Sequence, residues 1–315
     1  MRICLKLKIS YIPLPLLLFT EMIKIKEKIY KWLFAISAFT SLIFLAGIAF
    51  VLFLEGLTIF KTVGFSDFIF GKNWYPTHEP PEFGILPLIL GSLLVTFGAL
   101  VVCVVLGIGS ALYLYELAGQ TQKAILKPVI ELLASIPSIV FGFFGLVVVA
   151  PFLQKLLNIP VGLCAFTASL ILGIMAVPTV CSITEDALNY VPKSFKEASF
   201  ALGANRFQTL TKVVIPAAGS GILTAIMLGI SRIIGETMAV LMVSGGAAVI
   251  PVSFFQPVRP MTSAIAAEMG EAVFGSQHFH ALFAIGLVLF LIALFLNIFA
   301  EIMIHKYRSK LRLNR

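Results

Sequence analysis

The sequence predicts an all-α integral membrane protein with six transmembrane helices. The chain has 315 residues, of which 59% are hydrophobic and only 12% are charged. A soluble domain carries about 25% charged residues, so this composition excludes an ordinary soluble fold. Long apolar runs alternate with polar segments, and each run is long enough to cross about 30 Å of hydrocarbon as a helix. These spans are expected near residues 32–54, 84–115, 132–153, 159–183, 214–245 and 281–300.

The distribution of Lys and Arg predicts which side of the membrane each end occupies. Eighteen basic residues fall in the two termini and in segments 116–131 and 184–213, against four in the alternate segments. Positive charge marks the cytoplasmic side, so both the N-terminus and the C-terminus are predicted inside. The expected division is a basic N-terminus (1–31), a transmembrane domain (32–305) and a basic tail (306–315). Residues 1–21 are a candidate over-extended start, because the sequence from Met22 onward is typical of a basic start before a first span.

Charge and cysteine content exclude several other classes of function. The net charge of +8 does not come from a basic stripe interleaved with aromatic side chains, so no nucleic-acid partner is expected; the basic residues serve orientation in a lipid membrane. The four cysteines show no C-x-x-C pattern, and we predict neither a disulfide nor a metal site. His278 and His280 are interpreted as a solvated or capping pair. Glu268 and Glu271 are interpreted as a solvated outer face.

The longest polar segment between apolar runs is Glu197–Pro216. Its pattern is EAS, three residues, Gly203, nine residues and VVIP. From spacing alone, an ordinary helix-turn-helix connection between two spans explains it equally well. The pattern resembles the cytoplasmic coupling loop of ABC importer permeases, E-A-A, three residues, G, nine residues, I-x-L-P. The resemblance implies a loop at 185–213 that an ATPase subunit grips, with these contact residues: Glu197, Ala198, Ser199, Gly203 and Pro216.

Two charges interrupt the fifth apolar run. Arg232 and Glu236 lie four residues apart, which places both on one face of a continuous helix. A charge inside a span costs about 2.5–3.5 kcal/mol by insertion scales, so each is expected to face a pathway or the other rather than lipid. A purely structural pair is the alternative.

The surrounding motif S-R-x-x-G-E-T-M-A-V resembles the PstC-type permeases of the phosphate-specific ABC importer. Segments FGILPLILGS (83–92) and IPSIVFG (136–142) share that resemblance. It implies a type I ABC importer permease fold in a prokaryotic cytoplasmic membrane. The implied substrate-pathway residues are Arg232, Glu236, Thr237 and Ser231.

The resemblance also implies the partners. These are a second phosphate permease forming a heterodimer, a pair of ATP-binding subunits and an extracytoplasmic phosphate-binding protein. The chain has no phosphate-binding loop of the form G-x-x-x-x-G-K-[ST]. ATP and Mg are therefore expected on the partner ATPase, and this chain is expected to have no catalytic residue and no cofactor. Alternatives are a permease for another oxyanion such as sulfate or molybdate, a membrane enzyme and a non-transporting scaffold.

Overall fold

The structure is a computed structural model that describes the backbone of residues 14–313 and the side chains of residues 26–306. The possible start at Met22 and most of the basic tail lie outside the residues whose side chains are described. The chain divides into two compact units, residues 1–54 and 55–315. The described residues of the first unit all belong to helix α1 (Leu14–Thr58). The last residues of α1 fall in the second unit, where a 3-10 turn, η1 (Ile59–Lys61), follows.

The prediction of six transmembrane helices is confirmed. Within the described part of the chain, six helical segments are long and apolar enough to cross a membrane. Their ends differ from those of the expected runs by two to eleven residues. The segments are Lys26–Lys61, Leu86–Leu117, Ser138–Leu157, Ala165–Asn189, Arg206–Ile234 and Gln277–Lys306.

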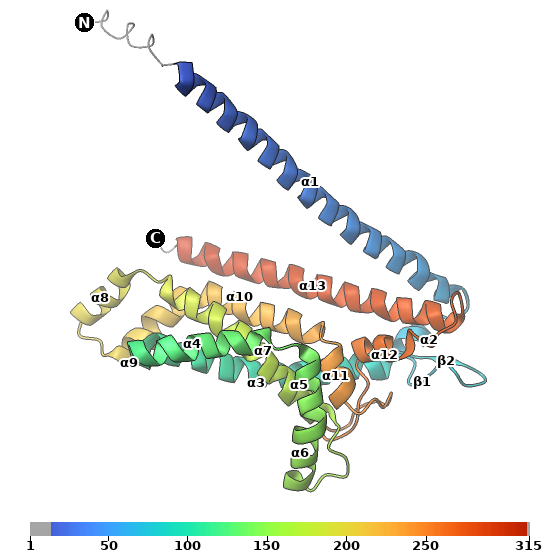
Figure 1. The fold of residues 1–315 in the computed structure, drawn as a ribbon. Helices are drawn as coiled ribbons and strands as arrows, with labels where there is room; N and C mark the ends of the chain where they lie inside the picture. The colour runs from blue at the N-terminus through green and yellow to red at the C-terminus, as the bar shows by residue number, and fades with distance from the viewer. Residues whose placement is uncertain (1–13, 314–315) are drawn as a thin grey trace, which may run out of the picture. The chain divides into compact units, whose positions relative to one another are not determined.

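The centre of the second unit is α7 (Ala165–Asn189), which packs against α3 (Leu86–Leu112) and α10 (Ile215–Ile234) (Figure 1). Small side chains permit this approach. A Cβ built on Gly107 would lie 2.9 Å from Val180 of α7, and one on Gly173 would lie 2.6 Å from Val102. Small residues let helix backbones come close, which supplies packing where lipid offers no hydrophobic drive. The small or medium buried residues of α3 recur every four positions: Gly91, Val95, Ala99, Cys103, Gly107 and Ala111.

The third span begins later than the expected residue 132. A separate helix, α4 (Gln120–Ser135), ends before Ile136, and the span is built from α5 (Ser138–Phe144), the π-helical η3 (Gly145–Val149) and α6 (Ala150–Leu157). Ile136 is extended, with φ −67° and ψ 127°, because a proline disfavours helical geometry in the residue before it. Pro87 likewise lies in the first turn of α3. Pro137, directly before α5, and Pro87 therefore both mark helix starts, and neither kinks a helix.

The fifth apolar run is not one helix, and the prediction of a continuous span over 214–245 is wrong. Helix α10 ends at Ile234, and α11 (Met238–Val243) begins after Gly235, Glu236 and Thr237. Glycine favours such an end because it has a low helix propensity. Thr237 departs from helical geometry, with φ −116° and ψ −55°.

The remaining elements gather at the two ends of the second unit. Figure 1 shows α8 (Lys193–Ala201) and α9 (Arg206–Thr209) at one end. The other end carries α2 (Phe65–Phe70), the antiparallel pair β1 (Trp74–Tyr75) and β2 (Glu82–Phe83), and α12 (Met261–Glu268). Two further π-helical segments, η2 (Tyr113–Leu117) and η4 (Leu210–Val214), follow α3 and precede α10. The last helix, α13 (Gln277–Leu313), packs along α10 and α12.

Candidate functional site

The predicted coupling segment folds as two short helices joined by a tight turn. Gly203 has φ +83°, a conformation in which a Cβ is unfavourable. The Gly203 amide donates to Phe200 O (2.9 Å) and the Ala204 amide donates to Ser199 O (3.2 Å). These two bonds form a Schellman motif, which satisfies the last carbonyls of α8. The predicted turn at Gly203 is confirmed.

Side-chain bonds fix the second helix and join it to the first. Asn205 and Gln208 form a reciprocal capping box at the start of α9, with distances of 2.8 and 3.0 Å. The hydroxyls of Ser199 and Thr209 are buried and lie 2.9 Å apart. Ser199, the residue that departs from the E-A-A pattern, therefore faces the partner helix and adds a hydrogen bond between α8 and α9.

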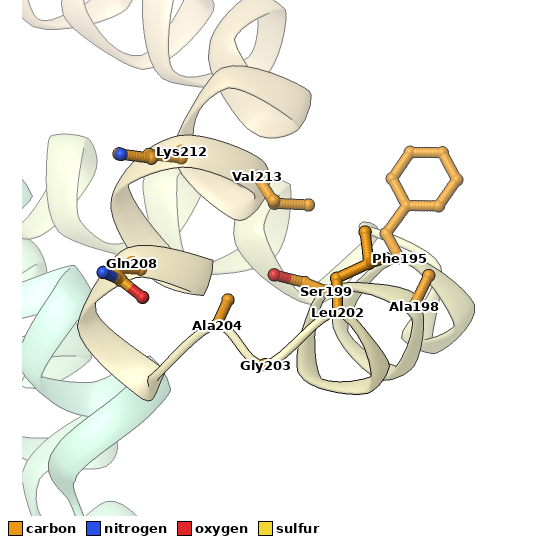
Figure 2. Close-up of a pocket in the computed structure, with 9 residues that line it drawn as sticks. All are labelled: Phe195, Ala198, Ser199, Leu202, Gly203, Ala204, Gln208, Lys212 and Val213. Carbon is orange, nitrogen blue, oxygen red and sulfur yellow. The ribbon is translucent and has the colours of Figure 1, made fainter.

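The outer face of this segment is open and apolar. A hollow of about 560 Å³ lies between α8 and the helix that begins at Arg206, and Figure 2 shows the side chains that line it. Glu197 and Ala198 are exposed on α8. Leu202 is 90% exposed and lies at the turn. Exposed apolar groups that lie together mark interaction sites, and Phe195 and Leu202 line this hollow together. The large exposed apolar side chains of the segment are Tyr190, Phe195, Phe200, Leu202 and Phe207.

Two ion-pair clusters attach this end to the spans. Lys196 of α8 lies 3.0 Å from Glu116 of η2 and 4.1 Å from the centre of the Tyr115 ring. Burial lowers the pKa of Lys196, but hydrogen bonds and charge interactions with Tyr115 and Glu116 outweigh it, so the pKa is raised. Helix α8 is thus connected to the segment that follows α3, and the amine stays charged.

The second cluster joins α4 to α7. The carboxylate of Glu185 is 1% exposed and lies 2.7 Å from Lys123 Nζ and 3.0 Å from Lys127 Nζ. The hydrogen bond to Glu185 raises the pKa of Lys127. Sequence reasoning missed both clusters, because partners 58 or more positions apart carry no local pattern.

Arg232 lies in the last turn of α10, and its Nε is buried without a hydrogen-bond partner among the described residues. The structure does not pair it with Glu236. The Glu236 carboxylate instead accepts from the Ala239 amide (3.3 Å), in the first turn of α11, where free amides favour a negative charge. The expectation that both charges share one helical face is wrong, since Gly235 ends the helix between them.

The two polar neighbours of these charges make local bonds. Ser231 Oγ donates to Asn297 Oδ1 of α13 (3.2 Å), and Thr237 Oγ1 donates to Gly235 O (3.3 Å). The structure thus brings Ser231, Arg232, Glu236 and Thr237 together around one helix break. An arginine whose buried donor is free can bind an anion there.

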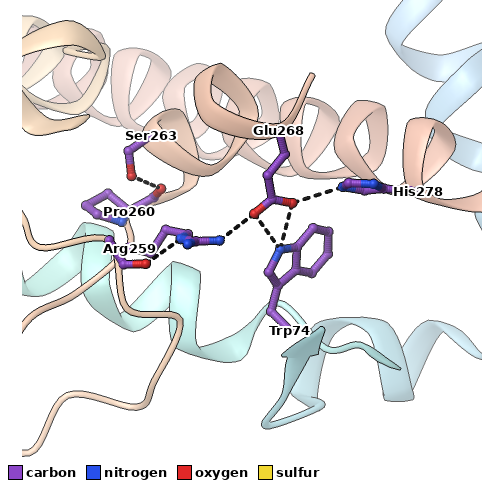
Figure 3. Close-up of polar contacts among 7 residues, drawn as sticks. Trp74, Arg259, Pro260, Ser263, Glu268 and His278 are labelled. Carbon is purple, nitrogen blue, oxygen red and sulfur yellow. Dashed lines mark hydrogen bonds and ion pairs between the residues drawn. The ribbon is translucent and has the colours of Figure 1, made fainter. Parts of the chain in front are cut away.

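A network at the opposite end of the second unit corrects two interpretations. Figure 3 shows the Glu268 carboxylate facing Arg259, Trp74 and His278. Its side chain is 14% exposed, so Glu268 is not part of a solvated face, while Glu271 is exposed. His278 and His280 are not a solvated pair either, since they contact Glu268 (2.9 Å) and Glu55 (3.0 Å). In the described part of the chain no three His, Cys, Asp or Glu side chains are grouped to hold a metal ion.

The fold resembles those of solved importers. The chain superposes on a subunit of the bacterial alginate ABC transporter, in complex with an alginate-bound periplasmic protein, with a TM-score of 0.62 at 15% identity, covering 88% of this chain and 96% of that one. The fold is therefore that of a type I ABC importer permease.

Sequence comparison defines the family. Residues 103–309 match the family described as binding-protein-dependent transport system inner membrane component. The chain is 38% identical over 281 residues to the probable ABC transporter permease protein YqgH of Bacillus subtilis, covering 88% of this chain and 89% of that protein. It is 36% identical over 293 residues to the phosphate transport system permease protein PstC of Mesorhizobium japonicum, covering 87% and 88%. The chain belongs to this family and, within it, to the PstC-type permeases.

Proposed function

We propose that this protein is one of two permease subunits that form the pathway for inorganic phosphate through the membrane of a prokaryote. The single observation that carries this is Arg232, whose buried Nε has no hydrogen-bond partner among the described residues and lies beside a helix break within the apolar run 214–245. The similarity to PstC proteins of phosphate transport systems, at 33–36% identity over most of the chain, supports phosphate as the anion.

The neighbouring Glu236 supplies discrimination between oxyanions. Phosphate near neutral pH keeps at least one O–H, which an ionised carboxylate accepts, whereas sulfate has none and is repelled. A site that must leave a buried polar group unpaired rejects the wrong ligand strongly. Ser231 and Thr237 add hydroxyls beside the same break. Binding here is weak, since a tight site would slow release.

The end of the second unit that carries α8 and α9 is the proposed site of ATPase coupling. The exposed apolar side chains and the hollow of α8 and α9 fit a protein surface that approaches closely. Glu197 and Ala198 are exposed on α8, and Pro216 lies in the first turn of α10. The basic residues of this segment support a cytoplasmic position. ATP-binding subunits would dock there, and an extracytoplasmic phosphate-binding protein would meet the far end.

The test is phosphate uptake by proteoliposomes containing the complete complex. Arg232→Gln should lower uptake at least about tenfold, because a hydrogen bond to a charged group contributes about 1.5–3 kcal/mol. Glu236→Gln should lower it less, because the amide oxygen still accepts. Lys155→Gln, which removes an exposed positive charge on α6, is the matched control and should transport normally.

Co-purification of the ATPase reports whether each variant assembles. Wild-type uptake by Arg232→Gln would remove Arg232 from the pathway. Uptake of sulfate or molybdate in place of phosphate by the wild-type complex would assign the pathway to another oxyanion.

A further inference from the structure

Glu268 accepts contacts from three separate parts of the chain. Trp74 Nε1 of β1 donates to both carboxylate oxygens (3.2 and 3.1 Å), and Arg259 Nη1 donates to Oε1 (2.5 Å). His278 Nε2 of α13 lies 2.9 Å from Oε2. Figure 3 shows these groups converging on one carboxylate at the end of α12. A half-buried charge with this many donors is fixed in position, since moving it would leave several donors unpaired.

Arg259 carries this constraint to the far end of α11. Its Nε donates to the carbonyl oxygen of Gly246 (2.7 Å). The neighbouring Val258 amide donates to Ser244 O (2.8 Å), and the Gly246 amide donates to Val258 O (3.1 Å). The chain immediately after α11 is therefore held by the segment that Glu268 orients.

The first residue pair of α12 holds the other end of α11. Thr262 Oγ1 donates to the carbonyl oxygen of Glu236 (2.9 Å), and the Met261 amide donates to Ser92 Oγ of α3 (2.8 Å). Glu236 in turn caps the first turn of α11. Helix α11 has only six residues, and a helix this short depends on contacts outside itself.

We propose that Glu268 is a positioning residue for the anion pathway: through Arg259 and α12 it holds both ends of α11 and so fixes the Glu236 carboxylate beside the turn of Arg232. This inference rests on the proposed function for its consequence in transport, but its structural content does not. Glu268 touches no anion, and it acts on the pathway from the opposite end of α12.

The first measurement is hydrogen exchange of backbone amides in the assembled complex. Glu268→Gln should speed exchange over residues 236–246 about tenfold, because weakening a charge-assisted bond by about 1.4 kcal/mol changes an opening equilibrium by that factor. Arg259→Lys, which keeps the charge but cannot also reach Gly246 with a second donor, should do the same. Glu271→Gln is the matched control, since Glu271 is exposed three residues away, and it should leave exchange unchanged.

The second measurement is uptake as a function of the concentration of loaded binding protein. If Glu268 positions the pathway, Glu268→Gln lowers the maximal rate severalfold and leaves the KM for the binding protein unchanged. A rise in KM alone would instead make Glu268 part of a docking surface and overturn the proposal. Unchanged exchange over residues 236–246 in both Glu268→Gln and Arg259→Lys would overturn it as well.

Two further variants test the role of Glu268. Glu268→Asp retains the charge on a shorter side chain and should give an intermediate effect if Glu268→Gln fails to assemble. In the double variant Glu268→Gln/Thr262→Val, the loss of maximal rate should match that of the worse single variant, whereas independent sites would multiply their losses. Amide hydrogen exchange does not depend on which solute is transported. A wild-type complex that carries no phosphate would therefore refute the proposed function, but it would leave the effect of Glu268 on residues 236–246 unaffected.

Discussion

Gly203 shows how one backbone conformation shapes the coupling segment. Its φ of +83° and the two Schellman hydrogen bonds direct the chain from α8 to α9. A Cβ at this position meets nothing within 4 Å, so a substitution is strained by its backbone alone. We expect Gly203→Val to cost about 1–3 kcal/mol locally, because β-branched residues resist positive φ. The variant should insert in the membrane but lose the ATPase, measured by co-purification.

A control separates strain from side-chain bulk at this turn. Gly203→Asn tolerates positive φ far better than valine does, and it should retain most of the ATPase and of uptake. Normal ATPase yield and uptake with Gly203→Val would show that the turn does not take part in coupling.

At the scale of single elements, the contact between α4 and α7 includes one buried carboxylate paired with two partly exposed lysines. Glu185 is 1% exposed, whereas Lys123 and Lys127 are each about one-third exposed and can reach water. Removing both lysines would strand a buried carboxylate, which costs about 3–5 kcal/mol. Lys123→Met/Lys127→Met should therefore lower the unfolding temperature more than Glu185→Gln does. Thermal unfolding of the purified complex measures the difference, and the reverse order would contradict the asymmetry.

The same contact has a defined pH dependence. The folded pKa of Lys127 is raised above 10.5 by its bond to Glu185. Its stabilisation is thus complete below the unfolded value and is lost as pH rises through the folded one. The contact between α4 and α7 is consequently at full strength at neutral pH.

The elements also show which features the sequence could predict. Length and hydropathy located six spans, and the E-A-A-like pattern located a turn that has the expected geometry. The break after Ile234 was missed, because a continuous apolar run hides both the end of α10 at Gly235 and the start of α11, which the Glu236 carboxylate caps. Glu268 was misread since its partners, Trp74 among them, lie up to 194 positions away. Local patterns carry local structure, whereas such contacts exist only in the folded chain.

At the scale of the whole molecule, the biased distribution of Lys and Arg makes the orientation testable. Eighteen basic residues on one predicted side against four on the other predict α8 in the cytoplasm and α12 outside. Cysteine at Glu271 should react with a membrane-impermeant maleimide in intact cells. Cysteine at Ser194, exposed in α8, should react only after the membrane is opened. The opposite pattern would invert the orientation.

The π-helical η4, between α9 and α10, has a consequence for how the chain tolerates changes in length. Such a segment accommodates one more residue than an α-helical turn of the same span, and α-helical residues advance by about 100° each. Deleting one residue from Leu210–Val214 would convert the segment to an α-helical turn and leave α9 facing in nearly its present direction. Inserting one residue into α10 itself, where no such turn absorbs it, would rotate α8 and α9 by about 100° around the axis of α10. A one-residue deletion within η4 should therefore be tolerated better by the assembled complex than a one-residue insertion into α10.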